Sequence, residues 1–289
     1  MSLANRGAMM IRVSIFFAML VLNWTVTADE LSLSSAQGFG FIEAGRFPDS
    51  QAKLLARRAA TVDAQRNLLE IINGVRVTAG TTVKDMVVES DIIGSRVKGL
   101  LRGAFETNSE VSMEEGSWVA QITLSICLNQ SDDKCRNRQT LASVTQPNLQ
   151  PAAPEDRFSV GAVDMEQNDS TLNIAKGSDQ FSGLIVDASG VDFSPMLDVR
   201  IQTSDGKEVY GPGHVAMGTD WLHWAKNREG ALSMIEVIGK TPVLVDVQGL
   251  GEQSQLVVSN EVAIEIFSSN LKGGDFLGAG KVVFIVAGS

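Results

Sequence analysis

Histidine, cysteine and tyrosine are scarce in this sequence, and their scarcity limits the chemistry that the chain can perform. The 289 residues include two histidines, two cysteines and one tyrosine. His214 and His223 lie nine positions apart, and no His-x-x-x-His or Cys-x-x-Cys motif accompanies them, so the sequence predicts no metal site. A Gly-x-Ser-x-Gly motif around a nucleophilic serine is also missing. We therefore predict no catalytic residues, no cofactor and no enzymatic activity.

One segment has a superficial likeness to a phosphate-binding loop. The stretch GGDFLGAGKV, residues 273–282, ends in Gly280-Lys281 and a valine. However, Asp275 stands where the motif needs its first glycine, and Val282 replaces the hydroxyl that binds the metal. An acid at that position would repel phosphate, and a strand is predicted where the motif needs a helix. The sequence therefore predicts no nucleotide binding.

A hydrophobic run long enough to span a membrane is missing as well. The apolar stretch at residues 13–22 is about half of the roughly 20 residues that a spanning helix needs. Arg6 and Arg12 precede it, and Val26 and Ala28 provide small residues before Asp29. This pattern predicts a secretory signal peptide, residues 1–28, cleaved between Ala28 and Asp29, with an uncleaved anchor as the alternative. No cysteine stands at the cleavage point, so no lipid attachment is expected there.

The net charge is strongly negative. It is −10 for the whole chain, and removal of Arg6 and Arg12 with the signal peptide makes it −12 for the mature chain. Such a surface repels nucleic acid and anionic lipid headgroups. We predict a periplasmic protein with no nucleic-acid partner and no transmembrane segment in the mature chain, and peripheral association with the outer membrane is compatible with this location.

The two cysteines, Cys127 and Cys135, flank a short polar loop, CLNQSDDKC. In an oxidising periplasm this pair predicts a local disulfide, and a reactive thiol is the competing interpretation. Cys127 lies near the end of a stretch in which every second residue, from Trp118 to Leu128, is apolar. This alternation predicts a half-buried strand. Cys127 itself falls on the polar side of that strand, and the EEGS sequence before it predicts a hairpin turn.

An alanine-rich helix is predicted to begin near Asp49 or Ser50 and to end before Gly74, which we expect to stop it with a positive φ. Its small residues recur every fourth position and form a ridge that another element can approach closely. The ridge includes Ala52, Ala56, Ala60, Ala64, Leu68 and Ile72. Strands are predicted at residues 38–45 and 75–83, and a short helix at residues 90–103.

The rest of the chain predicts a second folded unit. Residues 136–180 contain scattered prolines and no sustained period, which indicates a linker after a first module at residues 29–135. Residues 181–289 predict elements in the order ββαββαβ, including a hairpin at Asp205-Gly206 and one helix over residues 219–239. We therefore predict an α+β fold, with a long N-terminal helix packed on an antiparallel sheet and a second α+β domain.

Four short motifs stand out between residues 36 and 130: Ala-Arg-x-Ala-Ala at residues 56–60, Asp-Ala-x-Arg-Asn-Leu-Leu at 63–69, Gly74-Val75, and Arg-Val-x-Gly at 96–99. With these motifs, residues 36–130 resemble the Lpp-twenty lipoprotein family of bacterial envelopes. The resemblance implies a compact module with one long helix against an antiparallel sheet, associated with the outer membrane or periplasm. Members include flagellar assembly protein P, which builds disk-like structures around polar flagellar motors. This chain departs from the family in having no cysteine to lipidate after its signal peptide.

These observations predict a non-enzymatic assembly or scaffold protein of the envelope, a ring or disk subunit whose small domains stack edge to edge. The expected partners are further copies of the chain or other envelope proteins, including those of the flagellar basal body. The alternative prediction is a periplasmic binding module for a small molecule, a peptide or a glycan, because the second unit carries tryptophans, Trp221 and Trp224, that a ligand could contact.

Overall fold

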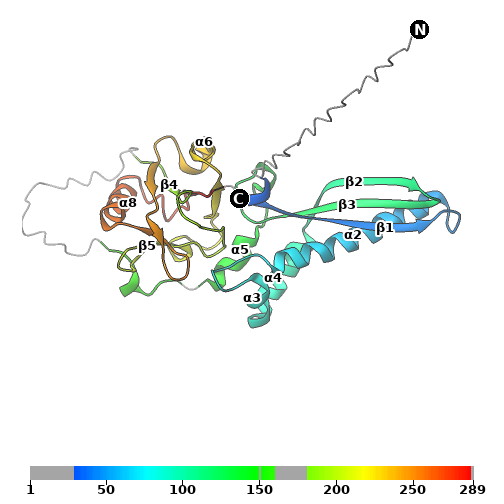
Figure 1. The fold of residues 1–289 in the computed structure, drawn as a ribbon, viewed down its shortest axis with the longest axis horizontal. Helices are drawn as coiled ribbons and strands as arrows, with labels where there is room; N and C mark the ends of the chain where they lie inside the picture. The colour runs from blue at the N-terminus through cyan, green and yellow to red at the C-terminus, as the bar shows by residue number, and fades with distance from the viewer. Residues whose placement is uncertain (1–28, 150, 160–180, 288–289) are drawn as a thin grey trace, which may run out of the picture.

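The computed structural model describes residues 29–149, 151–159 and 181–287, and Figure 1 shows two units arranged along the long axis. The first is an elongated blade, in which one long helix lies along a three-stranded sheet, and the second is rounded. The α+β class predicted from the sequence is confirmed. The predicted signal peptide and Ala28 lie outside the described residues, and Asp29 begins a short helix, α1 (Asp29–Ser32). No helix in the described ranges is long and apolar enough to cross a bilayer.

The sheet of the blade has the strand order β1-β3-β2 and is antiparallel throughout. Its strands are β1 (Leu33–Glu43), β2 (Phe105–Glu114) and β3 (Ser117–Cys127). The alternation predicted for β3 is confirmed, because Ala120, Ile122 and Leu124 are buried on one face. The predicted hairpin turn lies at Glu115 and Gly116, which both have positive φ, as two-residue hairpin turns require.

The long helix α2 (Asp49–Asn73) covers one face of this sheet, over β1 and β3 (Figure 1). The predicted ridge is fully buried and consists of Ala52, Ala56, Ala60, Ala64, Leu68 and Ile72. The partner of the ridge is a pair of glycines in β1, Gly38 and Gly40, at which an added Cβ would overlap the helix backbone. Small residues on both sides of the seam therefore allow the helix and the strand to approach more closely than larger side chains would permit.

Two polar side chains of α2 cover the free edge of β1. Asp63 accepts a hydrogen bond from the Phe39 N–H at 3.0 Å, and the Asn67 amide donates one to the Gln37 carbonyl at 2.7 Å. A further strand would need these same backbone groups. The middle of β1 is therefore protected against edge-to-edge pairing with another chain.

The bounds predicted for α2 are confirmed, but the way in which the helix is capped differs from the prediction. Gly74 follows the helix, but its φ is −82°, so it is not a positive-φ stop. Its N–H instead bonds to helix carbonyls, and the N–H of Val75 bonds to the Ile72 carbonyl, so the last turn ends without a left-handed residue. Pro48 is the N-cap residue, and no side chain caps the first turn.

The strand predicted over residues 75–83 is also wrong. A single bridge joins Arg76 and Thr82, and the helix α3 (Val83–Glu89) then begins. Thr82 and Asp85 form a reciprocal capping box, and these local hydrogen bonds favour a helix over an extended chain. The helix predicted over residues 90–103 is confirmed as α4 (Asp91–Arg102), capped by the Ser90 side chain.

Part of the predicted linker is folded. α5 (Leu141–Thr145) and the short 3₁₀ turn η2 (Gln146–Asn148) lie between the blade and the second unit, and the 3₁₀ turn η1 (Asp133–Cys135) comes just before the predicted linker. Leu141, Ala142 and Val144 are buried in a hydrophobic core that continues through both units. Residues 151–159, with η3 (Pro154–Asp156), lie against the second unit, where the Phe158 N–H bonds to the Glu208 carbonyl. Residues 160–180 lie outside the described ranges.

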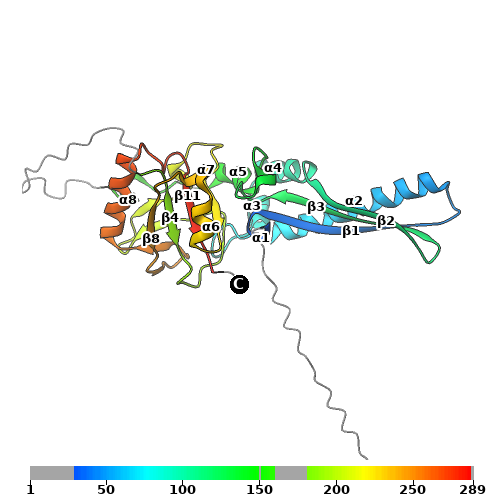
Figure 2. The same ribbon diagram turned by 90° about the horizontal axis from the view of Figure 1, so that it is seen from above.

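The second unit contains two four-stranded sheets, one parallel with the order β7-β11-β4-β8 and one mixed with the order β6-β5-β10-β9. The parallel sheet consists of β4 (Leu184–Asp187), β7 (His223–Ala225), β8 (Val243–Asp246) and β11 (Val282–Ile285). The mixed sheet consists of β5 (Ile201–Thr203), β6 (Glu208–Tyr210), β9 (Gly249–Leu250) and β10 (Leu256–Val258). The remaining elements are η4 (Pro212–His214), α6 (Arg228–Ser233), α7 (Ile235–Ile238) and α8 (Asn260–Lys272). Figure 2 shows α8 at the outer end of the unit and α6 and α7 toward the blade.

The predicted order ββαββαβ is wrong in its middle part. Residues 219–239, expected to form one helix, begin with strand β7 and continue as the short helices α6 and α7. β7 is an edge strand of the parallel sheet, but all three of its residues are buried, so it lacks the alternation that would have marked it in the sequence. The hairpin at Asp205-Gly206 is confirmed between β5 and β6, and α8 begins as predicted after Ser259, whose hydroxyl accepts from the Val262 N–H.

Candidate functional site

The blade and the second unit are joined by hydrogen bonds at two places. Just after the carboxyl end of α2, the carbonyls of Arg76 and Val77 accept hydrogen bonds from the N–H groups of Leu197 and Asp198, at 3.0 and 2.8 Å. At the other place, the N–H of Trp224 in β7 donates to the Ser131 hydroxyl at 3.1 Å. The loop that the sequence predicted as a strand therefore forms part of the contact between the units.

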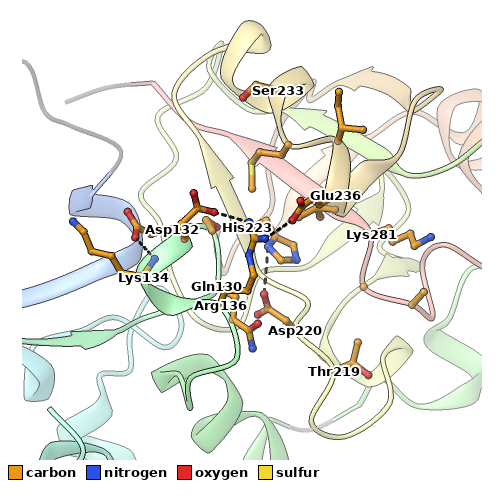
Figure 3. Close-up of a pocket in the computed structure, with 17 residues that line it drawn as sticks. Gln130, Asp132, Lys134, Arg136, Thr219, Asp220, His223, Ser233, Glu236 and Lys281 are labelled. Carbon is orange, nitrogen blue, oxygen red and sulfur yellow. Dashed lines mark hydrogen bonds and ion pairs between the residues drawn. The ribbon is translucent and has the colours of Figure 1, made fainter. Parts of the chain in front are cut away.

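A cleft of about 1180 Å³ lies beside the second of these contacts (Figure 3). The loop of residues 130–136 forms one wall, and α7, with the residues just before it, forms another. Asp220, His223 and Lys281 lie at the amino ends of β7 and β11 and complete the lining. The cleft is comparable in size to small-molecule sites, which commonly measure roughly 300–1,000 Å³.

The wall formed by residues 130–136 is fixed by a disulfide between Cys127 and Cys135. The predicted disulfide is therefore present, but the prediction that Cys127 faces solvent is wrong. Both cysteines are buried, in a small cluster with Leu33 and with Phe105 packed against it. The loop folds back over this end of the strand, so the side of β3 that is polar elsewhere is covered here.

An ion-pair chain crosses the mouth of the cleft. Arg136, next to the disulfide, contacts Asp133 at 2.6 Å and Glu236 of α7 at 2.8 Å. All three side chains are at least half exposed, so these ion pairs contribute little to stability. They nevertheless place a cation and an acid on the wall of residues 130–136 and an acid on the α7 wall, which a polar ligand could contact.

Asp220 and His223 form a buried pair in the cleft lining. The Asp220 Oδ2 and the His223 Nδ1 are 3.4 Å apart, and neither atom has a hydrogen-bond partner among the described residues. Burial raises the pKa of Asp220 to about 7, although N–H groups of Trp221 and Gln130 donate to its carboxylate and oppose the shift. Burial lowers the pKa of His223 to about 4. Between about pH 4 and 7 the pair is therefore mainly uncharged and able to exchange hydrogen bonds with a ligand.

Replacement of Asp220 by asparagine is expected to change how stability depends on pH. The folded pKa of Asp220 lies above its unfolded value of 3.8, so its contribution to stability is lost as pH rises from about 4 to 7. His223 has a folded pKa below its unfolded value of 6.5, so its contribution is lost as pH falls from 6.5 to about 4. The two effects offset each other in the wild type between pH 4 and 6.5.

In the Asp220→Asn variant only the histidine effect remains, and the free energy of unfolding should rise with pH by roughly 1 kcal/mol per pH unit relative to wild type. Urea denaturation at half-unit steps from pH 4 to 7 measures this slope. The same substitution at the exposed Asp192 is the control and should follow the wild-type profile. Parallel profiles for Asp220→Asn and wild type would contradict the assignment of a buried neutral pair.

A second ionic cluster, in the second unit, supports the segment that contacts the blade. Arg200 pairs with Asp198 and with Glu208, each at 2.7 Å, and Glu208 lies 3.5 Å from the His214 ring. Burial lowers the pKa of His214, although Glu208 opposes the shift. Because the Asp198 N–H donates to the blade, this cluster positions the backbone at the contact between the units.

A further candidate surface is the open face of the blade, the side of the sheet opposite α2. Phe39 and Phe41 of β1 are 45% and 65% exposed there, and they lie beside Gln121 and Val119 of β3 in the strand register. Single exposed apolar residues are normal on a protein surface, but two phenylalanines beside a valine form a patch. Nothing in the described part of the chain covers these phenylalanines.

The residues singled out in the sequence lie in different parts of the structure, and only some of them are near these sites. The disulfide between Cys127 and Cys135 fixes the loop that forms one wall of the cleft, whereas Ala56, Ala60, Ala64 and Leu68 are buried at the helix–sheet seam. Gly74 is at the end of α2, and Ala28 is not described. Sequence reasoning did not find Asp220 or Glu236, because no local pattern distinguishes either acid. In the described residues, no group of three or more histidines, cysteines and acids could hold a metal ion.

The fold defines a two-unit α+β protein, with a helix-and-sheet blade joined to a unit built on a parallel and a mixed sheet. Residues 183–288, which are the second unit, match the family model described as Treponema pallidum Tp0624, second domain. A search of the curated proteins found no match. The resemblance of residues 36–130 to the Lpp-twenty family stays a prediction.

Proposed function

We propose that the chain is a non-enzymatic assembly protein of the bacterial envelope, exported by its signal peptide, whose blades associate into a ring or disk. The observation that carries this proposal is the open face of the blade. A sheet with an apolar patch on one face is normally covered by another layer, and α2 provides that layer on only one side. A role around the flagellar motor is a finer proposal that depends on the resemblance to the Lpp-twenty family.

The proposal predicts that the mature chain, residues 29–289, self-associates. Light scattering over a concentration series should give masses at defined multiples of the monomer, and electron microscopy of the large fraction should show closed particles. A monomer at every concentration, alone and with added envelope extract, would contradict the proposal.

Substitution of the two exposed phenylalanines tests the surface itself. In the double variant Phe39→Ser/Phe41→Ser we expect the oligomer mass to fall, while the folded monomer loses only about 1 kcal/mol of stability because each side chain is about half exposed or more. The control is Val88→Ser/Ile92→Ser, which removes apolar side chains that are 80% and 63% exposed on α3 and α4. An equal loss of association in both variants would show that the open face has no special part in assembly.

The cleft supports a second function, a periplasmic binding module for a polar small molecule, peptide or glycan. Its size, the Asp220–His223 pair and the charged groups at its mouth favour this alternative. A ligand that binds only the native state raises the melting temperature in a saturable way. Screening of small-molecule, peptide and glycan libraries by thermal shift tests it, and the shift should disappear when Asp220 is replaced by leucine.

A further inference from the structure

The outer side of α2 carries a repeated pattern of charge and apolar surface. Arg58, Val62 and Arg66 follow one another at intervals of four residues, so they share one side of the helix, and all three are exposed. Neither arginine forms an ion pair within the described part of the chain. The neighbouring cations are engaged within the blade, because Arg57 donates twice to Glu106 and Lys53 lies over the Trp118 ring.

The open face carries the complementary pattern. In the strand register, Glu110 lies beside Gln121 and Phe39, Ser112 lies beside Val119 and Phe41, and Glu114 lies beside Ser117 and Glu43. The face therefore carries an acid in its first and third rows, and its apolar patch consists of Phe41 and Val119 in the second row with Phe39 in the first. Glu110 and Glu114 are exposed and form no ion pair with any described residue.

The spacing of the two patterns agrees. Arg58 and Arg66 are eight helical residues apart, which corresponds to about 12 Å along the axis. Glu110 and Glu114 are four strand residues apart, which corresponds to about 14 Å. Val62 lies midway between the two arginines, as the row of Val119 and Phe41 lies midway between the two acids.

The two patterns lie at similar heights in the blade, offset by a few residues. Gly40 faces Ala56 and Ala60, so Arg58 is level with Gly40, and Asn67 bonds to Gln37, so Arg66 is level with that residue. A second blade with the same orientation, displaced along the long axis by about two or three strand residues, places Arg58 near Glu114 and Arg66 near Glu110. Edge-to-edge stacking is less favourable, because Asp63 and Asn67 of α2 cover the edge of β1.

We propose that the occupant of the open face is a second copy of this chain, which seats the outer side of its α2 on that face with the two blades parallel. The contact joins two different surfaces, so a bound pair still offers one free helix surface and one free sheet face. Repetition of this contact gives a ring if the rotation from one copy to the next adds up to a full turn. The second units of all copies then lie at the same end of the ring. This inference rests on the proposed function and names the surfaces by which the copies assemble.

Charge reversal on either surface tests the pairing. Arg58→Glu/Arg66→Glu places acids against acids, and Glu110→Lys/Glu114→Lys places cations against cations. Each double variant alone should self-associate at least about tenfold more weakly than wild type, measured by light scattering on the mature chain. When the two variants are mixed, both contacts become complementary again, so the mixture should recover the wild-type mass. The variant with all four changes should also self-associate.

Matched controls carry the same changes in net charge away from the blade. Lys240→Glu/Lys272→Glu and Glu252→Lys/Glu265→Lys alter exposed residues of the second unit and should assemble like wild type. Circular dichroism and melting curves confirm that every variant is folded.

The outcomes separate the inference from the proposed function. If the wild type assembles and the arginine variant assembles equally well, the helix-on-sheet contact is overturned. That result would favour a symmetric contact between two open faces, and the proposed scaffold function would still stand. Failure of the mixture to recover association would also overturn the helix-on-sheet contact. A wild type that stays monomeric throughout would overturn both the inference and the proposed function.

Discussion

Substitution of Gly38 by alanine is expected to destabilise the blade severely, lowering the free energy of unfolding by about 3 kcal/mol or more. The new Cβ would overlap the backbone of Ala60 and Ala64, and backbone cannot rotate away as a flexible side chain can. The helix would have to move off the sheet and lose the packing of its whole ridge, an overpacking effect at the upper end of the usual range. Gly40→Ala should behave in the same way, because it meets the backbone of Ala56 and Ala60.

Chemical denaturation followed by circular dichroism measures this effect. Gly80→Ala is the matched control, because no atom lies within 4 Å of a Cβ added at Gly80 and its φ is not positive. We expect that control to stay within about 0.5 kcal/mol of wild type. A Gly38→Ala variant with the wild-type midpoint would show that α2 does not approach β1 as closely as the structure places it.

Removal of the disulfide is expected to have the second largest effect. The double variant Cys127→Ser/Cys135→Ser opens a short loop, whose closure stabilises the fold by roughly 2–3 kcal/mol in the entropic model. Two buried cysteines also become hydroxyls that need new hydrogen-bond partners, which adds to the loss. The loop carries Ser131, which bonds to β7, and Arg136, which pairs with Glu236, so the contact between the units should loosen as well.

Two measurements separate these effects. Melting curves with and without a reductant should show a shift in wild type and none in the double variant. Hydrogen exchange of the Trp224 amide reports on the contact between the units, and it should become faster in the variant because its acceptor, the Ser131 hydroxyl, is no longer fixed. An unchanged melting temperature under reduction would contradict a stabilising role for the disulfide.

Several parts of the fold could be predicted because their signals are local. The four-residue repeat of small residues predicted the buried ridge of α2, and the alternation of residues 118–126 predicted the buried face of β3. The Asp205-Gly206 and Glu115-Gly116 turns depend on positive φ at glycine, a property of the residue itself. The pairing of Cys127 with Cys135 was predicted from their short separation in a chain that we expect to be exported.

Other parts could not be predicted because they depend on residues far apart in the chain. β7 is a strand because β11 pairs with it, and β11 lies nearly 60 residues later. The loop after α2 is not a strand because a local capping box starts α3 and because Arg76 and Val77 bond to the second unit. Asp220 acquires its raised pKa only when the blade loop and β7 bury it together.

The sequence by itself determined the class of the fold, the long helix with its ridge and the disulfide, because periodicity, turn residues and spacing act over a few positions along the chain. The tertiary structure alone decided which residues form the cleft, which face of the blade stays open, and that the arginines of α2 and the acids of that face carry matching patterns on opposite sides. These features arise where segments meet across the fold, and burial, register and distance between such segments are set only by packing.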